Sequence, residues 1–282
     1  MNTATTSAAS AGTRVPRLSR LFTGGTTKKL VVIFALALAW EATVRLLKVN
    51  PLLFPPFSSV ASNLLAGLGL VPGGSGELWR YIWETLSVIV QSFGISVVLA
   101  IVITGLAVAS TWMRELLSVL TGMFQPLPSI ALLPMAILWF GFTRESLVFV
   151  VVMAMIWPIA SSLTTGFAMI PPTLFRLGRN YELGHFRLMT EILLPAALPM
   201  MISGLRVGWG FGWRTVVAAE LVFGATGAGG GIGWFINNSR LFMNITDGFA
   251  GILLVVIVGL LTESLFRMVQ YFTTHKWGTE AF

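Results

Sequence analysis

The sequence predicts an all-α integral membrane protein with six transmembrane helices. Of its 282 residues, 55% are hydrophobic and only 10% are charged, whereas soluble proteins carry about 25% charged residues. A soluble core cannot hide that much apolar surface, so most of it must face lipid. The chain has no cysteine and two histidines, which excludes disulfides, thiolate chemistry and a histidine-based metal cage. We expect no metal and no cofactor.

The amino-terminal segment precedes the first apolar run. Residues 1–29 are small and polar with several basic side chains, and they have no apolar run followed by a small-residue cleavage site. We therefore expect a disordered cytoplasmic tail. Residues 30–47 form the first predicted span, because about 20 apolar residues at 1.5 Å each cross the hydrocarbon layer. After prolines that break the helix, residues 58–70 are amphipathic and are expected at the membrane interface.

Five more apolar runs complete the predicted membrane domain, residues 30–277, which is followed by a short tail, 278–282. These spans are predicted at residues 85–110, 116–140, 146–169, 198–223 and 249–269. The run 116–140 contains Pro126, Pro128 and Pro134. We expect a kinked helix there rather than two short segments, with neighbouring helices satisfying the freed carbonyls.

The distribution of Lys and Arg predicts the orientation. With the amino terminus inside, the inner segments carry eleven basic residues: Arg14, Arg17, Arg20, Lys28, Lys29, Arg114, Arg176, Arg179, Arg187, Arg267 and Lys276. The outer segments carry five: Arg45, Lys48, Arg80, Arg144 and Arg240. This excess predicts that both termini are cytoplasmic. The formal net charge of +7 then follows from topology, and no nucleic-acid partner is needed to explain it.

One predicted inner loop, residues 170–194, is much longer than the others. Apolar residues recur in it at spacings of three and four among charged ones. This pattern indicates a pair of short helices lying on the membrane surface. A soluble partner is expected to dock there. The alternative is a loop that lies on lipid and binds no partner.

This loop resembles the cytoplasmic coupling loop of ATP-binding-cassette (ABC) importer permeases. Their motif reads Glu-Ala-Ala, three residues, Gly, nine residues, Ile-x-Leu-Pro. The ending is present as Ile192 to Pro195, but the glycine position holds Glu182, and the Glu-Ala-Ala positions hold residues 176–178, Arg-Leu-Gly. Gly184 lies two residues beyond the expected glycine. The resemblance implies that the ATPase contacts are Arg179, Asn180, Tyr181, Glu182, Leu183, Gly184, His185 and Phe186.

Further strings are similar to permeases of the nitrate, sulfonate and taurine importer group. They include Leu-Phe-Pro-Pro at 53–56, Pro-Ser-Ile-Ala-Leu-Leu-Pro at 128–134, Gly-Leu-Arg at 204–206, Ala-Ala-Glu at 218–220 and Gly-Ile-Gly at 231–233. The resemblance covers roughly residues 50–277, and these strings follow the order and spacing of that group.

The resemblance implies a type I ABC importer permease fold in the cell inner membrane. It further implies a path for a small anion of the nitrate, sulfonate, taurine or bicarbonate type. The expected partners are membrane lipid, two ATP-binding subunits, a second permease that is identical or paralogous, and a periplasmic or lipid-anchored binding protein. The chain has no Gly-Lys-Ser/Thr phosphate-loop ending. It is therefore not expected to be an enzyme, and ATP hydrolysis is expected in a separate subunit.

Four charged residues lie well inside the predicted spans, namely Glu41, Arg214, Glu220 and Glu263. Each costs about 2.5 to 3.5 kcal/mol near a bilayer centre, so each should be paired or lie on a wet path. We assign all four to the translocation path and Arg214 to the anion contact, because a guanidinium offers a planar fork to oxoanions. The alternative is an ion pair between Arg214 and one of the three glutamates that joins helices.

Other functions stay open at this point. Related permeases carry neutral or cationic nutrients, such as a pyrimidine vitamin precursor or riboflavin. A self-sufficient secondary transporter is a second alternative, although no inverted repeat with paired broken helices is visible. An intramembrane enzyme is a third, but no nucleophile and base lie at helical spacing within a span.

Overall fold

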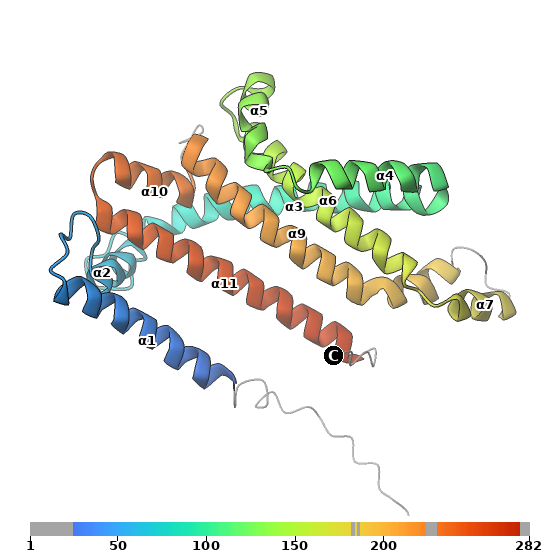
Figure 1. Ribbon diagram of the computed structural model, residues 1–282, viewed down its shortest axis with the longest axis horizontal. Coiled ribbons are helices and arrows are strands. Elements are labelled where there is room, and N and C mark those ends of the chain that lie inside the picture. The colour runs from blue at the N-terminus through green and yellow to red at the C-terminus, as the bar shows by residue number, and fades with distance from the viewer. Residues whose placement is uncertain (1–24, 182–183, 185–186, 224–229, 277–282) are drawn as a thin grey trace, which may run out of the picture.

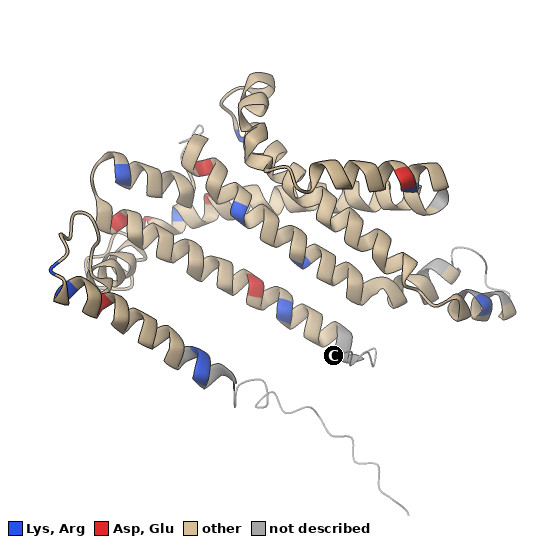
Figure 2. Cartoon of the chain, viewed as in Figure 1, with Lys and Arg blue, Asp and Glu red and all other residues tan. Residues whose placement is uncertain are grey.

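The computed structural model describes residues 25–181, 184, 187–223 and 230–276. Within these ranges the chain is helical with no strand, and long helices lie side by side with shorter ones at their ends (Figure 1). Charged residues are sparse along the long helices (Figure 2). The all-α membrane architecture predicted from the sequence is confirmed.

Four of the described helices are long and apolar enough to cross a membrane. They are α3 (Leu78–Ala109), α6 (Arg144–Ala168), α9 (Leu194–Phe223) and α11 (Ile245–Lys276). They correspond to the second, fourth, fifth and sixth predicted spans. A fifth crossing is formed if the bent pair described below counts as one span.

The first predicted span is the helix α1 (Gly25–Leu46), which is not among these four candidates. It begins five residues before the expected start, so residues 25–29, expected in the tail, belong to the helix. The rest of the predicted tail, 1–24, and the carboxy-terminal tail, 278–282, lie outside the described residues. The predicted interfacial segment is α2 (Phe57–Gly67).

The third predicted span is broken, so the expectation of one kinked helix is wrong. It consists of α4 (Thr111–Phe124), a short 3-10 turn η2 (Ser129–Leu132) and α5 (Leu133–Phe140), and its two halves meet at 90° (Figure 1). Pro126 and Pro128 lie in the break. Neither has an N–H to continue a helix, and each disfavours helical backbone in the residue before it. Two prolines two residues apart therefore end the helix, where a single proline often only bends it.

Helix α6 is the centre of the bundle: 72% of its apolar window is buried, against 22–28% in the other three spans. Small residues at every fourth position of α3 face it: Ser92, Ser96, Ala100 and Thr104, each at most 2% exposed. The Thr104 hydroxyl donates to the Ala160 carbonyl of α6 at 3.4 Å. Such stripes let helices approach closely in a membrane, where apolar surface alone gives little driving force.

A glycine stripe on α9 also packs against α6. Gly204, Gly208 and Gly212 lie against Ser162, Ile159 and Met155 respectively, and a Cβ atom on any of the three glycines would overlap those side chains. At Gly210, in contrast, a Cβ atom would meet only the Arg214 guanidinium, at 3.9 Å. The glycines before Arg214 therefore serve mainly to bring α9 and α6 together, and they hold the arginine at a fixed place on the bundle.

The long loop contains the helix α7 (Pro172–Asn180) and a π-helical turn η3 (Leu188–Leu193) that runs directly into α9. The expected pair of short helices is thus present as two helical pieces, although the second is continuous with the membrane helix. After α9, a short helix α10 (Ile232–Leu241) packs on α9 and α11.

Candidate translocation path and coupling segment

Arg214 has no ion pair in the part of the chain that the structure describes. Its Nε donates to the Gly210 carbonyl one turn earlier at 3.0 Å, and its guanidinium lies 5.1 Å from the centre of the Phe211 ring. Both contacts are within α9, so neither ties Arg214 to another helix. The alternative of an ion pair with one of the three glutamates is not observed.

The Arg214 side chain lines a cavity of about 260 Å³ beneath the break between α4 and α5. The walls come from the break and η2, from α6 and from α9: Phe124, Gln125, Pro126, Leu127, Pro128, Ser129, Ile130, Met153, Ala154, Trp157, Pro158, Phe211, Arg214, Thr215 and Ala218. Arg214 is the single charged residue in this lining. The cavity therefore offers a small solute one guanidinium and a few neutral polar groups. No carboxylate in the lining neutralises the guanidinium charge.

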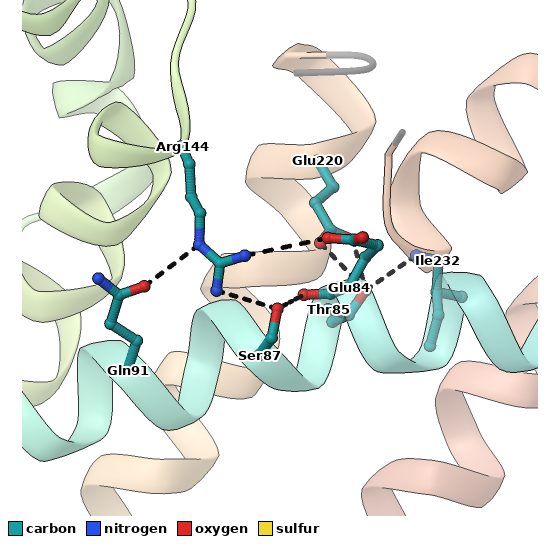
Figure 3. A network of polar contacts seen from close by, with 7 residues as sticks. All are labelled: Glu84, Thr85, Ser87, Gln91, Arg144, Glu220 and Ile232. Carbon is teal, nitrogen blue, oxygen red and sulfur yellow. Dashed lines mark hydrogen bonds and ion pairs between the residues drawn. The ribbon is translucent and has the colours of Figure 1, made fainter. Parts of the chain in front are cut away.

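Glu220 lies in a different place, in a buried polar network between α3, α9 and α10 (Figure 3). It is 2% exposed. Its carboxylate accepts hydrogen bonds from the Thr85 hydroxyl at 2.9 and 3.0 Å and from the Gly233 N–H at 2.9 Å. The same Thr85 oxygen accepts the Ile232 N–H at 2.8 Å. Glu220 and Thr85 thus each accept one free N–H group at the start of α10, where the helix dipole favours negative charge.

Two glycines make this contact sterically feasible. A Cβ on Gly231 would overlap the Glu220 carboxylate and the Thr85 hydroxyl, and a Cβ on Gly233 would overlap the Val217 carbonyl. The end of the glycine-rich stretch 224–233 is therefore a close-packed helix start. The earlier part, residues 224–229, lies outside the described residues.

A second network lies next to Glu220 on α3 (Figure 3). Arg144, at the start of α6, donates to the Ser87 hydroxyl at 2.9 Å and to the Gln91 side-chain oxygen at 3.2 Å, and lies 3.9 Å from Glu84. These contacts fix the start of α6 against α3. Arg144 is one of the basic residues that the charge distribution assigned to the outer segments.

Glu263 pairs with Arg206, which connects α11 to α9. The Arg206 Nε donates to the carboxylate at 2.8 Å, and its Nη1 donates to the Gln270 side-chain oxygen at 3.2 Å. Both side chains of the ion pair are about one third exposed. Glu263 is therefore a helix-joining residue whose charge is already compensated.

This pairing predicts a modest effect of Glu263→Gln. Partly exposed ion pairs contribute about 0.2 to 1 kcal/mol, so the melting temperature of the solubilised protein should fall by a few degrees or less. Glu115→Gln is the matched control, because Glu115 is exposed and has no ion pair within the described ranges. Equal melting temperatures for the two variants would show that the pair does not stabilise the bundle.

Glu41 lies in the last part of α1 and contacts the start of α2. It accepts a hydrogen bond from the Arg45 Nε at 2.5 Å, and from the Ser58 N–H and hydroxyl at 3.0 Å each. Ser58 lies in the first turn of α2, so Glu41 holds the start of that helix against α1. The structure does not bring the four predicted path residues together. Three carboxylates have partners in the chain, and Arg214 alone lines a cavity.

The predicted ATPase contacts are only partly described. Arg179 and Asn180 end α7, and Tyr181 and Gly184 follow it, with Tyr181 71% exposed. The other four, Glu182, Leu183, His185 and Phe186, lie outside the described residues. Gly178, at a Glu-Ala-Ala position of the resembled motif, packs against Leu188 of η3, so the two helical pieces of the loop contact each other.

Comparison with known proteins decides the family. Residues 96–274 match the family of binding-protein-dependent transport system inner membrane components. The chain belongs to this family. The match includes the broken span, the Arg214 cavity, the coupling segment, and Glu220 with the start of α10; Thr85 lies before the matched range.

Among relatives of this ABC permease, the taurine transport system permease protein TauC of Escherichia coli (strain K12) is 28% identical over 86% of this chain and 87% of its own length. The putative aliphatic sulfonates transport permease protein SsuC of Bacillus subtilis (strain 168) is 30% identical over 70% of each chain. These relatives are permease subunits, not ATPases.

A solved structure of the MetNI methionine ABC transporter in an inward-facing conformation is similar in fold, with a TM-score of 0.60 and 19% identity. The alignment covers 70% of this chain and 96% of that one. The permease fold of an ABC importer, predicted from the resemblance, is thus confirmed. The family match and the relatives confirm the transport function of the chain as a membrane permease subunit.

The sequence reasoning missed the partners of the charged residues. Thr85, Arg206 and Gln270 are polar residues in or near predicted spans, and each contacts one of the predicted path residues or its partner. A search for a second polar residue for every intramembrane charge would have named them as candidates. Their pairing was not deducible, because the contacts join segments that are 57 to 135 residues apart.

Proposed function

We propose that this permease forms the translocation path for a small oxoanion of the sulfonate, taurine, nitrate or bicarbonate type, with Arg214 as its contact in the membrane. The observation that carries the proposal is the position of Arg214. It is the one charged residue lining the cavity under the broken span, and it has no carboxylate partner in the described part of the chain. A guanidinium that is not neutralised attracts anions and repels cations.

Two further observations support an anionic substrate. The three other intramembrane charges are acidic, yet each is held by donors within the chain, so they do not present free negative charge to a solute. The names of two relatives specify taurine and aliphatic sulfonates, both of which carry a sulfonate group. Such a group accepts the paired N–H donors of a guanidinium.

Substrate competition tests this proposal. The transporter is reconstituted in liposomes with its ATPase and binding protein, and uptake of radiolabelled taurine is measured with unlabelled methanesulfonate, nitrate, bicarbonate, riboflavin or thiamine precursor added outside. In a second series each compound is labelled in turn. We expect ATP-dependent uptake of taurine or of one of the other anions. Transport of the neutral or cationic compounds alone would refute the proposal.

We also propose the partners and the topology. Two cytoplasmic ATPases supply the energy, a second permease that is identical or paralogous completes the path, and a periplasmic or lipid-anchored protein delivers the solute. Both termini are cytoplasmic, and residues 30–277 form the membrane domain between two short tails. The basic residues of the loop 170–194 and the family match support this arrangement. ATP hydrolysis by the purified chain alone would contradict it.

In this arrangement residues 179–186 contact the ATPase. The chain has no cysteine, so single cysteines can be introduced without a background. Tyr181→Cys and Gly184→Cys are both exposed positions in this segment, and Ser75→Cys is an exposed control in the loop before α3. With a thiol-to-amine cross-linker, we expect an adduct of permease and ATPase from the first two variants only. An adduct from the control alone would place the ATPase on the wrong side.

A further inference from the structure

A second cavity of about 260 Å³ lies between α4 and α6. Its polar lining consists of Arg114, Ser118 and Thr121 from α4 and Ser161, Thr164 and Thr165 from α6. No carboxylate contributes to the lining. Thr164 and Thr165 are in the last turns of α6, so this cavity is at the end of the bundle that leads into the coupling segment.

The second cavity follows the first along the same two helices. On α6, the Arg214 cavity is lined by residues 153–158 and the second cavity by residues 161–165. On α4, Phe124 lines the first cavity, and Thr121, one turn before it, lines the second. The rings of Phe124 and Trp157 stack at 5.0 Å and 9° at this boundary. The stacked pair therefore lies on the side of the mainly apolar Arg214 cavity that faces the polar second cavity.

The lining of the second cavity has hydrogen-bond donors without partners. Arg114 has no ion pair or side-chain hydrogen bond in the part of the chain that the structure describes. The Thr121 hydroxyl is shielded from solvent and has no partner within those residues, and a buried hydroxyl without a partner costs about 1 to 3 kcal/mol. Thr164 is satisfied, because its hydroxyl donates to the Ala160 carbonyl at 2.8 Å. An oxoanion would accept both the guanidinium and the Thr121 hydroxyl.

We propose that this cavity is a second oxoanion site, which the substrate occupies after it leaves Arg214 and before it is released beside the coupling segment. The site rests on the proposed function for its substrate class. Movement of one ion between the two sites requires the Phe124 and Trp157 rings to separate. The two arginines then bind the same solute in succession, and neither holds it permanently.

Labelling of a single cysteine tests the site in the assembled transporter. Ser161→Cys places a thiol in the second cavity of a chain without cysteines. The rates of modification by an anionic and by a cationic methanethiosulfonate reagent are followed by the mass of the permease chain. With Arg114 present the anionic reagent should be favoured, and Arg114→Gln should lower the ratio of the two rates about tenfold, as expected for one unit charge nearby. At Ser75→Cys the ratio should not change with Arg114→Gln.

Occupancy is tested with methanesulfonate as the probe. Potassium methanesulfonate should slow modification of Ser161→Cys at least threefold relative to potassium gluconate of equal ionic strength, because the larger gluconate does not fit. This protection should vanish in Arg114→Gln. If neither Arg114→Gln nor methanesulfonate changes the labelling while Arg214→Gln still lowers anion uptake at least tenfold, the second site is refuted and the proposed function stands. If the wild-type transporter takes up no anion, the proposed function fails first.

Discussion

Arg214→Gln is expected to lower anion uptake by the assembled transporter roughly ten- to hundredfold while the protein still inserts and assembles. A hydrogen bond to a charged group contributes about 1.5 to 3 kcal/mol, which corresponds to that range. Assembly should survive because the contacts of Arg214, with Gly210 and Phe211, lie within its own helix. The measurement is the initial rate of uptake in proteoliposomes, normalised to the amount of assembled complex.

Arg206→Gln is the matched control for this prediction. Arg206 lies on the same helix but pairs with Glu263 on α11, so its replacement should lower stability and leave the anion affinity of the surviving protein unchanged. Arg214→Lys should retain part of the uptake, because lysine keeps the charge but loses the planar fork. The anion contact would be disproved if Arg214→Gln kept full uptake, or if it lost uptake only because the protein no longer accumulated.

Gly231→Ala is expected to destabilise the bundle more than any other change considered for α10. The added Cβ would overlap the Glu220 carboxylate and the Thr85 hydroxyl. Overpacking costs about 1 to 3 kcal/mol, and displacing the carboxylate from the Gly233 N–H leaves buried polar groups unpaired at a further 1 to 3 kcal/mol or so. We expect a fall of several degrees in the melting temperature of the solubilised protein, with reduced accumulation in the membrane.

Gly94→Ala is the control for the glycine substitution. Gly94 lies inside α3, and nothing approaches its Cβ position within 4 Å, so alanine should be neutral or stabilising by about 0.5 to 1 kcal/mol. If Gly231→Ala melted at the same temperature as Gly94→Ala, the close-packed start of α10 would not exist as described, and Glu220 would be free to serve the path.

Apolar runs predicted four of the six proposed spans closely. The helices α3, α6, α9 and α11 contain or nearly match four of the predicted runs, because a backbone in lipid must satisfy its hydrogen bonds internally and a helix does so by itself. The break at Pro126 and Pro128 was misjudged. The prolines are visible in the sequence, but whether the two halves stay in line depends on what packs around them.

The roles of the intramembrane charges could be predicted only in part. The cost of a charge in lipid correctly indicated that Glu220 and Glu263 need partners. Which partner each takes is decided by packing: Glu220 and Thr85 contact the start of α10 because Gly231 and Gly233 leave room for them. The cavity beside Arg214 likewise depends on the 90° bend between α4 and α5, which no local pattern specifies.

The central claim, that an external motor drives solute through this chain, is tested most directly by comparing two kinds of proteoliposome. One contains the permease chain alone, and the other contains it with the ATPase and the binding protein. The account predicts concentrative uptake of labelled taurine or another small oxoanion only in the second, and only with ATP on the ATPase side. Equal uptake by the permease chain alone, driven by an ion gradient, would contradict it and identify a self-sufficient secondary transporter.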